Sequence, residues 1–321
     1  MRLFFMGSPE FAVPSLRAVV EAGHEVVAVY TQPDRPAGRG QKLAPPAVKA
    51  VALEYGLDVR QPRSISAPDV VEEIRGMAPE IGVIAAYGQL LKQRLLDVPP
   101  LGILNVHASL LPRWRGASPV AAAILAGDAE SGATIMRVQL ELDAGPILAQ
   151  VRVPIERDED TTGTLTEKIA DAGAGLLVDV LPRYVSGELV PVEQDASLVT
   201  YAPQLKKADA LLDFERDDAE TVSRKVRAYN PWPGAYAYLG SEPLRILECT
   251  PLQHNFKDKP GTVFAFAGVG ETPEYDAGFG VVCASGEIAV ERIQAAGGRP
   301  MLAAAWLNGH RHAIGKRLRA S

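Results

Sequence analysis

The chain has 321 residues, of which 47% are hydrophobic and 22% are charged. This composition is that of an ordinary globular protein, and the length predicts two domains. The formal net charge of −6 excludes a protein that is basic throughout. Only two cysteines occur, with no Cys-x-x-Cys pair, so we expect no structural zinc and a reduced, cytoplasmic setting. No apolar run reaches the roughly 18 residues of a membrane span, so we expect no membrane partner.

The first 190 residues alternate between apolar runs and stretches with helical spacing. The run 2–6, a helix from about Pro14 and the run 26–30 together predict a βαβ unit with a parallel sheet. Gly7-Ser8-Pro9 stands between the first strand and this helix in place of Gly-x-Gly-x-x-Gly, which weakens a dehydrogenase interpretation. We expect further strands at 57–60, 81–87, 103–106, 133–139 and 147–153, and helices near 46–55, 68–75, 118–125 and 162–181. The sequence therefore predicts a Rossmann-like, mostly parallel α/β domain over residues 1–190.

A second domain is expected after a linker of weak periodicity at residues 191–205. A helix near 219–229 precedes short strand candidates at 235–239, 244–248, 261–266, 280–284 and 287–293. Short strands bounded by turns predict a small barrel or sandwich over residues 206–321. This part has 15 Lys and Arg against 14 Asp and Glu, and its last 30 residues contain no acid. A basic terminal stretch of this kind can hold a polyanion.

The most informative stretch runs from Gly102 to Gly116 and reads Gly-Ile-Leu-Asn-Val-His-Ala-Ser-Leu-Leu-Pro-Arg-Trp-Arg-Gly. Asn105 and His107 are two residues apart on the predicted strand, so both project from one face at its carboxyl end. In an open parallel sheet this end is where ligands bind. Asn can donate a hydrogen bond to a developing oxyanion, and His can shuttle a proton near neutral pH.

Asn-Val-His followed by Ser-Leu-Leu-Pro-x-x-Arg-Gly resembles the signature of the folate-dependent formyltransferases. Leu-Asp-Ala-Gly at 142–145 resembles the second motif of that family, and the resemblance extends over essentially the whole chain. It implies an OB-like barrel in the C-terminal domain and formyl transfer in the N-terminal domain. It also implies that Asn105, His107 and Asp143 are catalytic, with Asp143 orienting the imidazole.

The resemblance further implies that 10-formyltetrahydrofolate is the formyl donor, with tetrahydrofolate as the product and no metal. Ser109, Leu110, Leu111 and Pro112 are expected to hold the folate in part. Apolar walls are expected from Tyr87, Gly88 and Leu90, and from residues 138–143. An apolar slot with a few polar anchors suits a flat pterin.

The acceptor is indicated by a basic segment at 32–49, which carries a net charge of +3 inside an acidic domain. Long loops without regular structure in compact domains are often functional, and this one follows the carboxyl end of a strand. It resembles the loop with which relatives that formylate initiator methionyl-tRNA contact the acceptor stem. We therefore expect Arg35, Arg39 and Lys42 to bind tRNA, and the protein to act as a monomer.

Two alternatives remain open from the sequence. One is a formyltransferase that acts on a small amine, such as an amino sugar nucleotide, because such relatives share the catalytic motifs. The other is a nucleic-acid-binding protein with an inactive Rossmann half. The basic segment at 32–49 favours tRNA over the first alternative, and the trio Asn105, His107 and Asp143 disfavours the second.

Overall fold

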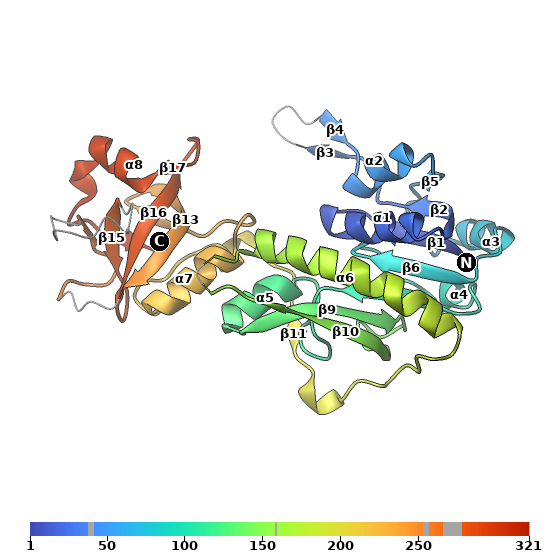
Figure 1. Ribbon diagram of the computed structural model, residues 1–321. Coiled ribbons are helices and arrows are strands. Elements are labelled where there is room, and N and C mark those ends of the chain that lie inside the picture. The colour runs from blue at the N-terminus through green and yellow to red at the C-terminus, as the bar shows by residue number, and fades with distance from the viewer. Residues whose placement is uncertain (38–41, 158, 253–256, 266–277, 321) are drawn as a thin grey trace. The chain divides into compact units, whose positions relative to one another are not determined.

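A computed structural model describes residues 1–37, 42–157, 159–252, 257–265 and 278–320 (Figure 1). The chain divides into two compact units, each made of several segments. The first unit comprises Met1–Pro119, Glu130–Pro154 and Thr166–Ala202, and the second comprises Val120–Ala129, Ile155–Leu165 and Pro203–Ser321. Two short segments of the N-terminal half thus belong to the second unit, and most of the expected linker belongs to the first. Among the described residues, no helix has both the length and the apolar character needed to cross a membrane.

The first unit is built on a seven-stranded sheet in the order β10-β9-β7-β6-β1-β2-β5. The five strands from β7 to β5 are parallel, β9 pairs antiparallel with β7, and β10 pairs antiparallel with β9. This confirms the expected mostly parallel α/β sheet. The strands are β1 (Arg2–Gly7), β2 (Glu25–Tyr30), β5 (Val59–Arg60), β6 (Ile81–Ala85), β7 (Ile103–His107), β9 (Glu130–Arg137) and β10 (Ile147–Pro154).

Helices cover both faces of this sheet, which explains why its central strands are apolar on both sides. The helices of the first unit are α1 (Val13–Glu21), α2 (Ala47–Glu54), α3 (Pro68–Gly76), α4 (Gln93–Leu96) and most of α6 (Thr162–Val185), whereas α5 (Pro119–Ala126) lies almost wholly in a segment of the second unit. On one face, Phe4 and Met6 share a core cluster with Ile74 of α3. On the other, α6 approaches so closely that a Cβ on Gly173 would lie 2.9 Å from Val106 Cγ1.

The strand order places a switch point between β1 and β6. From β1 the chain proceeds through β2 to β5 on one side, whereas β6 and β7 extend the sheet on the other. Ligands of open α/β sheets bind at the carboxyl ends of strands at such a point. His107 is the last residue of β7 and therefore lies at this edge.

The segment at 32–49 differs from the loop expected from the sequence. Its described part forms a hairpin in which β3 (Arg35–Ala37) pairs antiparallel with β4 (Lys42–Ala44). The expectation of a loop without regular structure was wrong. Strands of three residues are held by backbone pairing and are too short to show an alternation of apolar residues in the sequence.

Residues 191–202 pair with other segments of the first unit. Val192 and Ile147 exchange two backbone hydrogen bonds of 2.8 Å each. Further on, β11 (Tyr201–Ala202) pairs in parallel with β8 (Arg115–Gly116), immediately after the Asn-x-His strand. This segment therefore runs beside the loop that follows β7.

The second unit contains a seven-stranded sheet of the order β14-β15-β16-β13-β12-β18, with β17 paired to β16. Backbone bonds from Val263 N to Lys316 O and from Leu318 N to Gly261 O join the two ends of this order. The result is a near-closed antiparallel barrel, which confirms the expected architecture. Its strands are β12 (Tyr236–Leu239), β13 (Glu242–Leu252), β14 (Val263–Phe264), β15 (Phe279–Val282), β16 (Glu287–Ala295), β17 (Met301–Leu302) and β18 (Leu318–Arg319), with helices α7 (Ala219–Ala228) and α8 (Ala303–Gly309).

The described residues of the two units also contain four short 3₁₀ helices: η1 (Glu10–Ala12), η2 (Ala196–Leu198), η3 (Lys207–Ala210) and η4 (Arg311–Ala313).

Candidate active site

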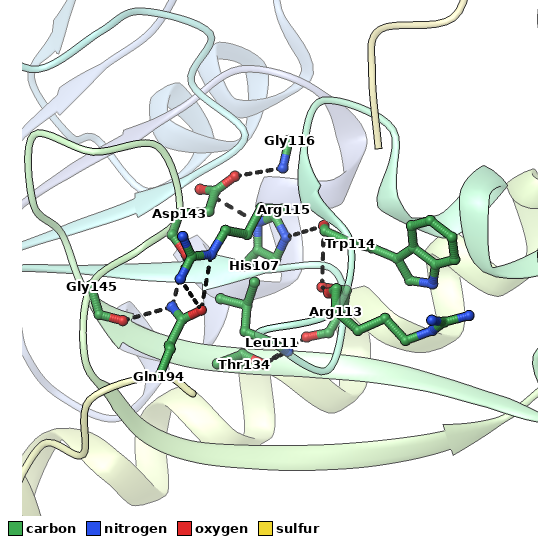
Figure 2. Close-up of polar contacts among 11 residues, drawn as sticks. His107, Leu111, Arg113, Trp114, Arg115, Gly116, Thr134, Asp143, Gly145 and Gln194 are labelled. Atoms are coloured by element: carbon green, nitrogen blue, oxygen red, sulfur yellow. Dashed lines mark hydrogen bonds and ion pairs between the residues drawn. The ribbon is translucent and has the colours of Figure 1, made fainter. Parts of the chain in front are cut away.

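The candidate site is organised around the imidazole of His107, which is only 6% exposed. Its Nε2 lies 3.0 Å from the carbonyl oxygen of Trp114, and its Nδ1 lies 3.7 Å from Oδ1 of Asp143 (Figure 2). A carbonyl oxygen can only accept a hydrogen bond, so Nε2 carries a proton in this arrangement. Nδ1 is then the nitrogen that faces the carboxylate.

Asp143 lies on the turn between β9 and β10, and its carboxylate is held from two sides. Oδ2 accepts a hydrogen bond of 2.9 Å from the backbone N–H of Gly116, while Oδ1 faces His107. Both residues that face the imidazole have left-handed backbones, with φ of +50° at Asp143 and +62° at Trp114. Such values are rare outside glycine and persist where surrounding contacts impose them. The structure thus brings two of the three expected catalytic side chains together.

Asn105 lies two residues before His107 on β7, so both side chains leave the same face of the strand. Its neighbours in the sheet are Ile84 of β6 and Met136 of β9. The side chain is half-buried. Its placement is compatible with an amide donor beside the imidazole.

Arg115 and Gln194 form a contact to the Asp143 turn that sequence analysis did not find. Arg115 is 6% exposed, and its Nε and Nη2 donate to Oε1 of Gln194 at 3.1 and 2.9 Å. The amide nitrogen of Gln194 in turn donates to the carbonyl oxygens of Asp143 and Gly145, each at 2.8 Å (Figure 2). Gln194 stands in the expected linker, where neither periodicity nor a motif marks it.

The residues expected to hold the folate after β7 are partly occupied with their own loop. The Ser109 hydroxyl donates to the carbonyl of Arg113 at 2.7 Å, and the carbonyl of Ser109 accepts from Thr134 at 2.6 Å. Leu111 is buried, and its N–H donates to Thr134 Oγ1 at 3.1 Å. Leu110 and Pro112 keep part of their surface exposed. Of these four side chains, those of Leu110 and Pro112 are the ones open to a ligand.

The three folate-wall residues after β6 lie in different surroundings. Tyr87 is 1% exposed and packs in the core cluster that contains Phe4, and this burial raises the pKa of its hydroxyl. Within the described parts of the chain, that hydroxyl has no hydrogen-bond partner. Gly88 adopts φ of +81°, and Leu90 is 82% exposed. The turn thus buries its aromatic ring and presents its leucine.

The basic hairpin is tied to the sheet at its base. Nζ of Lys49 lies 2.9 Å from both carboxylate oxygens of Asp34, and the Gln61 amide donates to Oδ1 of Asp34 at 2.8 Å. The hydrogen bonds from Gln61 and Lys49 lower the pKa of the Asp34 carboxyl. Of the three expected tRNA-binding residues, Arg35 is exposed at the start of β3 and Lys42 begins β4, whereas Arg39 lies outside the described residues.

Across the described part of the chain, no group of three or more His, Cys, Asp or Glu side chains is arranged to hold a metal ion. The polar groups gathered here are the imidazole of His107, the carboxylate of Asp143, the guanidinium of Arg115 and the amide side chains of Asn105 and Gln194. They are suited to proton transfer and to hydrogen bonding of a developing negative charge.

Solved structures share this fold at low sequence identity. An N-formyltransferase from Helicobacter canadensis, in complex with folinic acid and dTDP-3-aminofucose, superimposes with a TM-score of 0.66 at 19% identity, covering 90% of this chain and 99% of its own. HypX from Aquifex aeolicus, in complex with tetrahydrofolic acid, superimposes with a TM-score of 0.64 at 18% identity, covering 98% of this chain and 48% of its own. At these identities the likeness establishes the fold.

Sequence comparison defines the family. Residues 1–181 match the formyl transferase family, and residues 204–311 match the formyl transferase C-terminal domain. The methionyl-tRNA formyltransferase of Thiobacillus denitrificans is 47% identical over 321 residues, covering 100% of both chains. That of Chloroflexus aurantiacus is 46% identical over 309 residues, covering 96% of this chain and 97% of its own. The chain therefore belongs to the methionyl-tRNA formyltransferase family.

Proposed function

We propose that this protein transfers the formyl group of 10-formyltetrahydrofolate to the free amino group of initiator methionyl-tRNA. The observation that carries the proposal is the placement of His107 between the Trp114 carbonyl and Asp143. It occurs on a chain whose full-length relatives bear the name methionyl-tRNA formyltransferase. The products are N-formylmethionyl-tRNA, which serves translation initiation, and tetrahydrofolate.

The reaction needs a proton acceptor and a donor for the oxyanion. The amine nitrogen attacks the formyl carbon and forms a tetrahedral intermediate, and the bond from that carbon to N10 of the folate then breaks. One proton leaves the attacking nitrogen and one reaches the departing N10. Because Nε2 of His107 donates to Trp114, the proton exchange falls to Nδ1, on the side of Asp143. Asn105 donates to the oxyanion, and the Asp143 carboxylate stabilises the imidazolium that forms.

Folate is inferred to bind beside the turns that follow β6, β7 and β9. Leu90, Leu140 and Leu142 are all more than half exposed, although large apolar side chains are usually buried. Leu140 and Leu142 lie on the same loop as Asp143. These surfaces, together with Leu110 and Pro112, supply apolar area for a flat pterin. The folates in the structures of two distant relatives support a folate as donor.

The acceptor arm of the tRNA is inferred to contact the hairpin of β3 and β4 through Arg35, Arg39 and Lys42. The ion pair of Lys49 with Asp34 supports this assignment, because it holds the base of the hairpin. The barrel of the second unit is inferred to bind the tRNA backbone through its basic C-terminal stretch. We expect the protein to act as a monomer in the cytoplasm, where charged tRNA is available.

The test is the acceptor specificity of the purified full-length protein. Transfer of a labelled formyl group from 10-formyltetrahydrofolate is measured with initiator methionyl-tRNA, free methionine and an amino sugar nucleotide as separate acceptors. We expect rapid labelling of the tRNA and slow or undetectable labelling of the two small amines. Preferential labelling of the amino sugar nucleotide would refute the proposed acceptor, and no labelling of any acceptor would refute formyl transfer.

A further inference from the structure

We propose that Gln194 is a positioning residue for formyl transfer, which holds the turn of Asp143 in the conformation that faces His107. The inference rests on the proposed function and adds a residue to the same site. Gln194 contacts neither the imidazole nor the carboxylate directly in the contacts described above. It acts through the backbone of the turn.

Every hydrogen-bonding position of the Gln194 amide is used in this arrangement. A glutamine amide has two N–H donors and an oxygen with two lone pairs. The nitrogen donates to the carbonyls of Asp143 and Gly145 at 2.8 Å each, and the oxygen accepts twice from Arg115, at 2.9 and 3.1 Å. Two carbonyls that flank one residue are thus bound by a single side chain, which restrains the turn.

The backbone on both sides of Gln194 is anchored. Val192 exchanges two backbone hydrogen bonds with Ile147, just after the Asp143 turn. Thr200 accepts from the N–H of Arg115 at 2.9 Å, and its hydroxyl accepts from the N–H of Trp114 at 2.9 Å. Residues 192–200 therefore present Gln194 from a fixed position.

Arg115 connects these contacts of Gln194 to the imidazole. Its neighbours in the chain supply the Trp114 carbonyl that accepts from His107 and the Gly116 N–H that donates to Asp143. The contacts close into a ring, from His107 through Trp114 and Arg115 to Gln194, and back through Asp143 (Figure 2). Each member of the ring constrains the position of the two beside it.

The Asp143 turn depends on such restraint. Its φ of +50° is unfavourable for an aspartate, so the turn can relax when its carbonyl contacts are lost. The 3.7 Å between Nδ1 and Oδ1 leaves little tolerance before the carboxylate no longer acts on the imidazole. Misplacement of a catalytic group by about 1 Å can cost on the order of 10²-fold in rate.

We call the hydrogen bonds of Gln194 to Arg115, Asp143 and Gly145 the clamp. Two substitutions distinguish a role of these hydrogen bonds in positioning Asp143 from a role of the side chain in packing alone. Gln194→Ala removes all four hydrogen bonds, whereas Gln194→Glu keeps oxygen for Arg115 and loses the donors to the turn. We expect both to lower kcat by roughly 10- to 100-fold. KM for folate and for tRNA should stay within about twofold, because the binding surfaces are untouched. Gln93→Ala is the matched control, since Gln93 is exposed on α4 and donates only to Asp97 in the contacts described.

A double substitution tests whether Gln194 acts through Asp143. In an Asp143→Asn background, Gln194→Ala should cost less than about threefold further, because the group it positions is already lost. If the loss of kcat in the double variant equals the product of the losses in the two single variants, the proposal is overturned. A raised KM with unchanged kcat in Gln194→Ala, or full activity of Gln194→Glu, would also overturn it. Gln194→Glu preserves the Arg115 contact and so gives a folded test even where Gln194→Ala unfolds.

The outcome is separable from the proposed acceptor. All losses are expressed relative to the unsubstituted protein, with whichever amine that protein formylates. Should it formylate an amino sugar nucleotide in place of the tRNA, the acceptor assignment fails while the clamp is tested on that amine. Unchanged kcat in Gln194→Ala beside full tRNA formylation by the unsubstituted protein would refute the clamp alone.

Discussion

The carbonyl oxygen of Trp114, a residue with a left-handed backbone of φ +62°, lies 3.0 Å from Nε2 of His107. This contact fixes which imidazole nitrogen remains for chemistry. Nδ1 faces Asp143, which follows the exposed Leu142 in the loop between β9 and β10. In the mechanism proposed above, Nε2 donates its proton to the Trp114 carbonyl in a hydrogen bond and Nδ1 exchanges the proton of the reaction.

Asn105 and Asp143 should both contribute to the chemical step rather than to folate binding. We expect Asn105→Ala and Asp143→Asn each to lower kcat by at least about 10²-fold, the usual scale for losing an oxyanion donor or a group that supports an acid or base. Steady-state kinetics gives kcat, and fluorescence titration gives the folate affinity. Near-normal kcat in either variant would remove that residue from the mechanism, and loss of folate binding would make it a binding residue.

Arg39 should affect the tRNA and leave the folate half of the reaction intact. A charge-assisted phosphate contact supports a loss of roughly 10- to 100-fold in tRNA-dependent kcat/KM on Arg39→Ala. The measurement is the ratio of tRNA formylation to slow formylation of a small amine. Arg94→Ala, an exposed arginine on α4, is the control. If both activities fall together in Arg39→Ala, the segment shapes the catalytic pocket and not tRNA binding.

The basic C-terminal stretch should bind tRNA mainly through charge. Arg311, Lys316 and Arg319 are exposed, whereas Arg317 already binds Glu215 and the carbonyl of Pro260. Replacing the first three by alanine should weaken binding similarly for all tRNA sequences. The slope of log K against log salt should flatten by roughly 3, at a little under one unit for each of the three lost phosphate contacts. An unchanged slope would show that these side chains are only solvated.

The second unit should show an acid-dependent contribution from Asp218, the N-cap of α7. Its carboxylate accepts from the side chain and the backbone N–H of Thr221, and these bonds lower its pKa. A lowered pKa in the folded state adds stability above the ordinary aspartate range, and this is lost as the pH falls through the folded pKa. We expect Asp218→Ala to reduce the free energy of unfolding by about 1 kcal/mol near neutral pH. Urea unfolding near pH 3 should show a smaller loss of unfolding free energy for Asp218→Ala than at neutral pH. The control, Asp258→Ala at an exposed position, should change the free energy of unfolding little at either pH. Equal losses for Asp218→Ala at both pH values would contradict a contribution from the ionised carboxylate.

The sequence was sufficient for most of the fold because its strands carry strong apolar runs. After Arg2 and Glu25, strands β1 and β2 are apolar to their ends, as β6 is throughout, and residues 3–7 of β1 and 28–30 of β2 are buried, as expected for a parallel sheet covered on both faces. The hairpin of β3 and β4 could not be found in this way. Pro36 and Leu43, among its described side chains, are exposed, so burial imposes no period on them, and the strands are paired through the backbone.

The candidate site was predictable only where a motif marked it. His107 and Asp143 stand in recognisable motifs, and the structure brings them together. Arg115 and Gln194 are ordinary polar residues in sequence, and their contact joins a short strand and a loop 79 residues apart. Tyr87 is expected from the motif to line the folate site, but its ring packs in the hydrophobic core. Contacts made by loops across the fold leave no trace in local spacing.

The most direct test of the central claim is the single-turnover rate of formyl transfer from 10-formyltetrahydrofolate to initiator methionyl-tRNA, with enzyme in excess. This rate excludes product release and, at saturating enzyme, substrate affinity, so it reports the chemical step. We predict that His107→Ala lowers it by at least about 10²-fold while folate and tRNA still bind. A His107→Ala protein that formylates the tRNA at the unsubstituted rate would contradict the account.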